Sequence, residues 1–187
     1  MKRVAIFASG SGSNAENIIN YFNKTQTATV TKVFCNNKNA AIFDRCKRLL
    51  VACVLFSRED FFKTENILSQ LKESADVIIL AGFLWKIPSN LIEAFPNKII
   101  NIHPALLPKY GGKGMYGMHV HNAVKENEET ETGITIHYVN EDYDEGGIIF
   151  QAKTALNSED TPETIAQKIH LLEQEHFPKT IEKVIQQ

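Results

Sequence analysis

The chain has 187 residues, of which 43% are hydrophobic and 22% charged, enough apolar material for one domain with a sizeable core. Twenty basic and 22 acidic residues give a net charge of −2, a balance that argues against nucleic acid as the main partner. No apolar run approaches the length of a membrane span, so we expect no membrane association.

Short apolar runs alternate with helical hydrophobic patterns through residue 102. We expect strands at residues 4–8, 29–35, 51–56, 77–81 and 98–102, and helices at 14–24, 41–49, 60–72 and 88–95. The run at 77–81 is apolar at nearly every position, as in a strand that is buried on both faces. The alternation predicts a Rossmann-like α/β fold with a mostly parallel central sheet and helices on both faces.

The pattern changes after residue 110. Residues 110–117 hold four of the ten glycines and predict a mobile loop, which a helix at 119–126 follows. Strands at 133–139 and 148–153 predict an antiparallel C-terminal addition to the sheet. The last helix begins at Thr161-Pro162, a capping residue followed by proline in the first turn, and Pro178 is expected to kink or end it. No repeat or interdomain linker interrupts the chain, so we predict a single domain over residues 1–187.

A glycine-rich turn follows the first expected strand and opens the first helix. Its residues 10–15, Gly-Ser-Gly-Ser-Asn-Ala, fit the spacing G-x-G-x-x-G/A, in which glycine lets the backbone approach a phosphate and the helix N-terminus supplies N–H donors. The alternative is a plain tight turn with a capping residue. The second strand ends without an acid for ribose hydroxyls, and no GK[ST] signature is present, which favours a simple phosphate over a dinucleotide.

Asn101 and His103 lie at the end of the apolar run that forms the fifth expected strand. Residues i and i+2 of a strand project from the same face, so the amide and the imidazole are expected to point the same way. Open α/β sheets bind ligands at the carboxyl ends of their strands. An amide donor beside a titratable imidazole suits oxyanion stabilisation and proton transfer.

The other histidines allow plainer interpretations. His137 falls in an expected strand, where structural hydrogen bonding is the favoured role, and His170 is expected to be a partly exposed polar residue of the last helix. His119 and His121 could offer two metal ligands from one strand face. No Cys, Asp or Glu lies near them at ligand spacing, so we expect no metal.

A run of acids at residues 141–145 precedes the pair Gly146-Gly147. It suits a solvated turn, and equally a loop that folds over a site. A carboxylate from this run beside His103 would favour the imidazolium and raise the pKa of His103.

Three cysteines, Cys35, Cys46 and Cys53, form no CxxC pair. Their odd number and wide spacing argue against a zinc knuckle or a disulfide framework. A reducing, cytoplasmic location fits them best.

Four motifs in chain order carry a resemblance that covers almost the whole chain: residues 9–14 after the first strand, 80–83, 101–110, and 133–139 leading into 144–146. Their sequences are SGSGSN, LAGF, NIHPALLPKY, and GITIHYV followed by DEG. In this order they resemble the folate-dependent phosphoribosylglycinamide formyltransferases of purine biosynthesis.

The resemblance implies a reaction in which the amine of glycinamide ribonucleotide attacks the formyl carbon of 10-formyltetrahydrofolate, the co-substrate, through a tetrahedral intermediate. Asn101 and His103 are expected to hydrogen-bond the oxyanion, and His103 also to handle the proton. Asp144 is expected to keep the imidazole charged and oriented. Losing one oxyanion donor typically costs about 2.7–4 kcal/mol of barrier.

The resemblance also implies the binding residues. Gly12, Ser13 and Asn14 are expected to hold the ribonucleotide phosphate, and Glu173 the glycinamide end, with Glu175 as the alternative in register. Folate contacts are expected along one segment and one loop, together with Arg58 and Asn101: Leu84, Trp85, Lys86, Ile87, Glu141, Asp142 and Tyr143. Some relatives carry arginine where this chain has Trp85.

The implied organisation is a phosphate-binding half at about residues 1–100 and a folate-binding, catalytic half at about 101–187. The two substrates are the expected partners of a monomer or weak homodimer, and the longer loop at 111–118 is a lid or an insertion. Methionyl-tRNA formyltransferases carry a further C-terminal domain and formyltetrahydrofolate deformylases an N-terminal regulatory one, and we expect neither here. A deformylase-like hydrolase and a non-catalytic phosphosugar-binding module stay open as alternatives.

Overall fold

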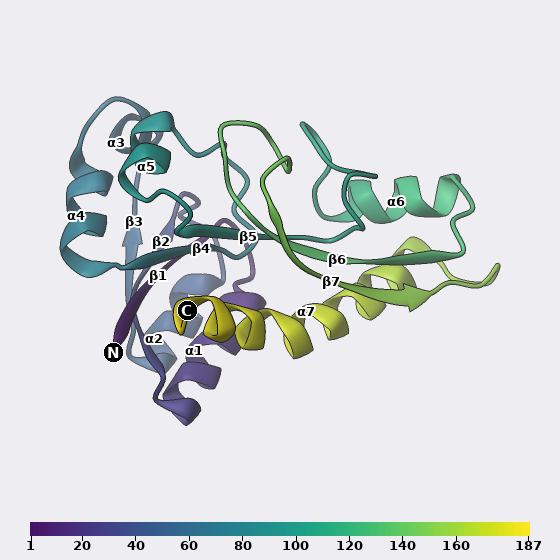
Figure 1. The fold of residues 1–187 in the computed structure, drawn as a ribbon, viewed down its shortest axis with the longest axis horizontal. Helices are drawn as coiled ribbons and strands as arrows, with labels where there is room; N and C mark the ends of the chain where they lie inside the picture. Colours follow the sequence, from purple (N-terminus) through teal and green to yellow (C-terminus); the bar gives the residue numbers. More distant parts are fainter.

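A computed structural model describes all 187 residues and shows a seven-stranded sheet in the order β3-β2-β1-β4-β5-β6-β7 (Figure 1). The strands are β1 (Lys2–Ala8), β2 (Ala28–Cys35), β3 (Ala52–Leu55), β4 (Val77–Leu80), β5 (Ile99–His103), β6 (Glu131–Tyr138) and β7 (Ile148–Ala155). The first five strands pair in parallel, and β6 and β7 add to β5 in antiparallel orientation. The predicted fold class is confirmed.

Helices cover both faces of this sheet (Figure 1). They are α1 (Ser13–Thr25), α2 (Ile42–Leu49), α3 (Arg58–Phe62), α4 (Asn66–Ser74), α5 (Ser89–Ala94), α6 (Met118–Glu126) and α7 (Pro162–Ile185). None of them combines the length and the apolar character needed to cross a membrane.

Alternate residues of β1 feed two separate cores. Val4, Ile6 and Ala8 belong to a cluster of 27 buried residues that α1, α6 and α7 complete. Ala5 and Phe7 face a second cluster of 15 buried residues, beneath α3, α4 and α5. Because β1 has helices over both faces, every one of its residues from Val4 to Ala8 is fully buried.

The helix predicted at residues 60–72 is wrong in its boundaries. The structure has two helices there, because Ser57 and Asp60 form a capping box that starts α3 at Arg58, ahead of the apolar pattern. The Thr64 hydroxyl then donates to the Asp60 carbonyl and accepts from the Asn66 N–H, which ends α3 and prepares the start of α4.

Pro178 was expected to kink or end the last helix, and the second alternative is wrong, since α7 continues to Ile185. A proline in a helix interior costs about 3 kcal/mol. Phe177 and Ile181, on either side of it, are fully buried, and burying such side chains contributes roughly 1.5–3 kcal/mol each. Packing against the sheet therefore offsets the missing hydrogen bond.

The strand order reverses between β1 and β4, which is the point where open α/β sheets bind ligands. The glycine-rich turn leaves β1 at this edge, and residues 81–87 leave β4 beside it. Ser9 joins the two, since its N–H donates to the Gly82 carbonyl at 3.0 Å and its hydroxyl accepts from the Leu84 N–H at 3.1 Å. Both ligand-binding segments expected from the sequence therefore start from one rigid edge.

Candidate active site

One cavity of about 960 Å³ lies along the carboxyl ends of β1, β4 and β5. Ligand pockets typically measure about 300–1,000 Å³, so this one has room for two small molecules side by side. Its walls come from segments distant in sequence: residues 9–14, 80–87, 101–104, 112–117, 137–144 and one face of α7.

The glycine-rich turn forms one end of the cavity. Gly12 is the N-cap of α1 in a left-handed conformation, with φ of 75°, and no side chain caps the helix. The first-turn N–H groups of α1 are therefore free to bind an anion. A side chain at Gly12 would strike Ile42 of α2, whose Cβ would be 2.9 Å away, so glycine is required here on both counts.

Arg45 of α2 holds this turn from outside. Its Nε donates to the Ser11 carbonyl at 2.7 Å, and its guanidinium pairs with Glu16 of α1. Arg48 pairs with the same carboxylate but makes no bond to the turn. The turn expected to bind an anion is thus connected to α1 and α2.

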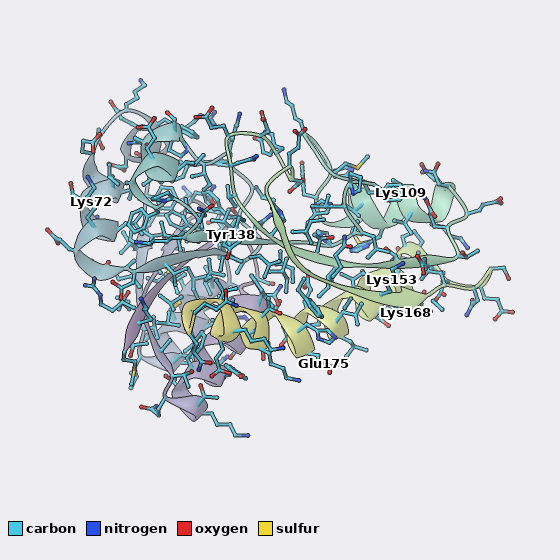
Figure 2. The ribbon with its side chains drawn as sticks, in the orientation of Figure 1. Lys72, Lys109, Tyr138, Lys153, Lys168 and Glu175 are labelled. Atoms are coloured by element: carbon cyan, nitrogen blue, oxygen red, sulfur yellow. The ribbon has the colours of Figure 1, made fainter.

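Asn14 and Glu173 meet across the cavity end. The Asn14 amide donates to Glu173 Oε2 at 2.9 Å and accepts from Gln174 Nε2 at 3.1 Å. The Glu173 side chain is 15% exposed and lines the cavity, whereas Glu175 is 59% exposed, pairs with Lys179, and is labelled on the outer side of α7 in Figure 2. Of the two registers considered, only Glu173 faces the site.

Asn101 and His103 lie on the same side of β5, since Asn101 bonds His137, and His137 and His103 both approach Asp144. Asn101 lies opposite His137 in the β5–β6 pairing, and its amide nitrogen is 3.1 Å from His137 Nε2. The Tyr138 carbonyl, 2.8 Å from His137 Nδ1, can only accept, so Nδ1 carries the proton and Nε2 accepts from Asn101. The second N–H of the Asn101 amide remains for a ligand.

His103 is buried, with 4% of its side chain exposed, between two oxygens. Its Nε2 donates to the Tyr110 carbonyl at 2.7 Å. Its Nδ1 lies 3.5 Å from Asp144 Oδ2, a contact between an imidazole and a carboxylate that is longer than a hydrogen bond. Nδ1 is therefore the nitrogen that is free to take up a proton, and Asp144 is placed to stabilise the resulting charge.

Burial lowers the pKa of His103 below its ordinary value, and this effect outweighs the opposite influence of Asp144 and of the Tyr110 carbonyl. Asp144 does raise the pKa of His103, as expected of a nearby carboxylate, but the larger effect of burial opposes the expectation that Asp144 keeps the imidazole charged. The shift favours the neutral imidazole in the free protein.

For the pKa of Asp144, the neighbouring groups outweigh the effect of burial. Burial disfavours its charge, but the proximity of His137 and of His103 and the Gly112 N–H at 3.0 Å together hold its pKa below the ordinary value. The acid run at 141–145 is thus not merely a solvated turn, because Asp144 approaches His103, which lies 41 residues earlier at the end of β5.

A second polar group fixes the chain just beyond His103. The Thr135 hydroxyl donates to the Ala105 carbonyl at 2.7 Å and accepts from the Leu107 N–H at 3.0 Å. Gln151 on β7 reaches the same hydroxyl at 2.9 Å. The antiparallel strands therefore hold the segment that carries His103 into the cavity.

The opposite end of the cavity is more apolar. It is lined by members of the segment and loop expected to contact folate: Leu84, Trp85, Lys86, Ile87, Asp142 and Tyr143. Lys86 Nζ lies 5.7 Å from the centre of the Tyr143 ring, so the segment and the loop meet across the opening. Arg58 and Glu141 do not line this cavity. Arg58 stacks on Phe62 and Trp85, and Glu141 lines a smaller neighbouring pocket of about 260 Å³.

A family model described as formyl transferase matches residues 2–181. The chain belongs to the formyl transferase family. One member, the phosphoribosylglycinamide formyltransferase of Bacillus subtilis (strain 168), is 34% identical over 191 residues that cover 99% of this chain and 95% of that protein. The chloroplastic phosphoribosylglycinamide formyltransferase of Arabidopsis thaliana is 36% identical over 182 residues, or 94% of this chain and 62% of that protein.

Solved structures of other members have the same fold. The phosphoribosylglycinamide formyltransferase of Bacillus halodurans superposes with a TM-score of 0.87 at 34% identity, over 98% of this chain and 95% of that one. The glycinamide ribonucleotide transformylase 1 of Geobacillus kaustophilus gives a TM-score of 0.89 at 33% identity, over 98% of each chain.

Three histidines of this formyl transferase lie at the cavity without having been predicted there. His137, expected to be structural, bonds Asn101, and His170 lies beside Glu173, which raises the pKa of His170 through a hydrogen bond. His121 lines the cavity from helix α6, so the idea that His119 and His121 share a strand face is wrong. No group of three or more His, Cys, Asp or Glu side chains lies close enough together to hold a metal ion.

Proposed function

We propose that this chain transfers the formyl group of 10-formyltetrahydrofolate to the amine of glycinamide ribonucleotide, a step of purine biosynthesis. The observation that supports this most is the single cavity joining an anion-binding helix terminus, at Gly12, to the cluster of Asn101, His103 and Asp144. Its two relatives named above carry that activity in their names.

The ribonucleotide phosphate binds the free N–H groups of α1 at Gly12, Ser13 and Asn14, and Glu173 contacts the glycinamide end. Folate lies along residues 84–87 and against Asp142 and Tyr143, with its formyl group toward β5. Arg58 and Glu141 lie outside the main cavity, and a role for them requires the folate tail to extend toward Trp85 and the neighbouring pocket. The chain's own residues supply every contact in this scheme.

The amine nitrogen attacks the formyl carbon, and the carbonyl oxygen becomes an oxyanion that accepts the free N–H of Asn101. The amine proton passes to Nδ1 of neutral His103, and Asp144 stabilises the imidazolium. When the tetrahedral intermediate collapses, the bond from carbon to the folate N10 breaks. That nitrogen takes up the proton, and formylated ribonucleotide and tetrahydrofolate leave.

A hydrolase that uses water in place of the amine is the competing function. The two are separated by following loss of the formyl group from 10-formyltetrahydrofolate with and without glycinamide ribonucleotide. We expect loss only with the ribonucleotide, and Asn101→Ala, as the matched inactive variant, to be at least ~100-fold slower because it lacks the oxyanion donor. Equal rates without the ribonucleotide would indicate the hydrolase, and binding of both molecules without turnover a non-catalytic module.

A further inference from the structure

A short segment that follows β5 contacts both His103 and Asp144, the pair to which proton transfer is assigned above. The Tyr110 carbonyl accepts from His103 Nε2 at 2.7 Å, and the N–H of Gly112 donates to Asp144 Oδ2 at 3.0 Å. The placement of the imidazole relative to the carboxylate therefore depends on the backbone of residues 110–112.

The contact from Tyr110 decides which nitrogen of His103 carries the proton. A carbonyl can only accept, so Nε2 of the neutral imidazole is protonated and Nδ1 is not. Nδ1 is the atom that faces Asp144, at 3.5 Å. If the carbonyl turned away, the proton would be free to move to Nδ1 and donate to Asp144, and the nitrogen that is to accept the amine proton would be occupied. The direction of one carbonyl therefore determines whether the ring can act as a base.

That carbonyl belongs to a residue in an unfavourable backbone conformation. Tyr110 has φ of 57°, in the left-handed region that bulky side chains rarely adopt. Strained backbone of this kind persists only where the surrounding structure holds it, and it gathers at functional sites. Whatever holds the backbone of Tyr110 therefore also fixes the direction of its carbonyl.

The side chain of Tyr110 provides such a hold. Its ring packs against the larger core cluster, and its hydroxyl donates to Glu129 Oε1 at 2.8 Å. Glu129 lies in the connection between α6 and β6. Hydrogen bonds from Lys109 and from Tyr110 hold the pKa of Glu129 below its ordinary value, so the acceptor is charged. Hydrogen bonds to charged groups are roughly twice as strong as those between neutral groups.

Lys109 makes the other contact with this carboxylate, with its Nζ 2.8 Å from the same oxygen. The lysine side chain is 67% exposed and is labelled beside α6 in Figure 2. Exposed ion pairs of this kind contribute little to stability. Burial and the nearby Glu129 raise the pKa of Tyr110 to about 12, so its hydroxyl keeps the proton that it donates. The bond from Tyr110 is therefore the one that can hold the backbone beside His103.

We propose that Glu129, through the hydroxyl of Tyr110, positions the carbonyl that keeps Nδ1 of His103 free. Neither side chain lines the cavity, so both are positioning residues. The effect on catalysis rests on the proposed function, in which Nδ1 takes up the amine proton. The effect on the imidazole itself is a property of the free protein.

The kinetic test begins with Tyr110→Phe, which removes the hydroxyl and keeps the ring. We expect kcat to fall about tenfold, because a misplaced catalytic group slows the chemical step, and both KM values to change less than about twofold. Glu129→Ala is expected to show the same loss, and Glu129→Gln, which keeps an accepting oxygen, to recover most of it. Since Tyr110→Phe and Glu129→Ala break one bond, their combination should be no slower than either alone.

Lys109→Met is the matched control, because it removes the other partner of Glu129 and leaves the hydroxyl bond. It is expected to keep the wild-type kcat. A loss in Lys109→Met as large as in Glu129→Ala would overturn the proposal, as would losses that multiply in the combined variant or a wild-type kcat in Tyr110→Phe.

Nitrogen NMR shifts of the His103 ring in the ligand-free protein, at a pH where the ring is neutral, report its tautomer directly. In wild type Nε2 should carry the proton, and in Tyr110→Phe and Glu129→Ala a share of it should appear on Nδ1. Either variant suffices if the other fails to fold. An unchanged tautomer alongside normal wild-type turnover would refute the inference alone. A changed tautomer supports the inference even if wild type fails to turn over the ribonucleotide, which would refute the proposed function alone.

Discussion

His103 lies between two opposing influences, and their balance can be measured at this single residue. Burial lowers the pKa of His103, and Asp144, with Nδ1 and Oδ2 3.5 Å apart, is the strongest influence that raises it. The unfolded chain binds a proton at His103 below about pH 6.5, whereas the folded protein resists it. His103 therefore contributes stability above that pH, and this contribution is lost as the pH falls below it.

We predict that the imidazole of His103 titrates below pH 6.5 in the free protein, and lower still in Asp144→Asn. Removing the carboxylate leaves the Tyr110 carbonyl alone to oppose the effect of burial. The measurement is an NMR titration of the histidine ring resonances in both proteins. Glu173→Gln, which removes a cavity carboxylate from beside His170, serves as the control and should leave the His103 titration where it is. A higher pKa in Asp144→Asn would contradict the arrangement.

At the scale of single residues, the sequence predicts those features that local geometry alone determines. Asn101 and His103 could be paired because residues two apart in a strand share a face, whatever the rest of the fold. The contact between His137 and Asn101 could not be predicted, because it depends on the register between β5 and β6. The position of His121 at the cavity could not be predicted either, because it depends on how α6 packs. The net pKa shift of His103 needs the degree of burial, which a sequence pattern does not provide.

Among the elements, α2 is the one whose contribution to the site is least visible in the sequence. Its residues make no direct contact with the cavity, but Arg45 donates to the Ser11 carbonyl within the anion-binding turn. The bond fixes the direction of the peptide just before Gly12, the N-cap of α1. Arg45 is thus a positioning residue for the backbone that we propose binds phosphate.

We predict that Arg45→Met raises the KM for the ribonucleotide about fivefold, the equivalent of ~1 kcal/mol, and leaves kcat unchanged. The loss arises because the turn is no longer held in its anion-binding form. Arg48→Met is the matched control, since Arg48 also pairs with Glu16 but does not touch the turn. Steady-state kinetics of both variants decide the point. Equal KM values for the two, or an altered KM for the formyl donor in Arg45→Met, would show that Arg45 acts only through general stability.

Elements could be predicted from the sequence where one local signal dominates. The strands at 29–35 and 77–81 agree with β2 and β4 to within one residue at each end, because apolar runs bounded by polar turns allow few alternatives. The split between α3 and α4 could not be predicted, because a capping box competes there with a helical hydrophobic pattern. The continuation of α7 through Pro178 could not be predicted either, because it depends on burial of Phe177 by the sheet.

At the scale of the whole molecule, the larger of the two cores crosses the boundary between the predicted phosphate-binding and catalytic halves. The cluster of 27 residues includes Val4 and Ile18 from the phosphate-binding half and Ile134 and Ile181 from the other. Helix α7 packs against α1 as well as against β6 and β7. The predicted single domain over residues 1–187 stays a prediction, and this shared core is the physical reason to expect it, since its buried residues come from both halves.

A single domain predicts one cooperative unfolding transition. The only tryptophan, Trp85, lies in the aromatic cluster of the phosphate-binding half, and its fluorescence reports on that half. The helical circular dichroism signal contains the 24 residues of α7, which are in the other half. In urea the two signals should give the same midpoint.

A matched perturbation sharpens this prediction. In Gly133→Ala the added Cβ would strike the backbone of Ala152 on β7 and approach Leu106, a change confined to the C-terminal half. Overpacking of this kind costs roughly 1–3 kcal/mol. If the chain unfolds as one unit, the midpoint reported by Trp85 must fall by as much as the midpoint reported by circular dichroism. A Trp85 midpoint that stays at its wild-type value while the other falls would divide the chain into two independently folding parts.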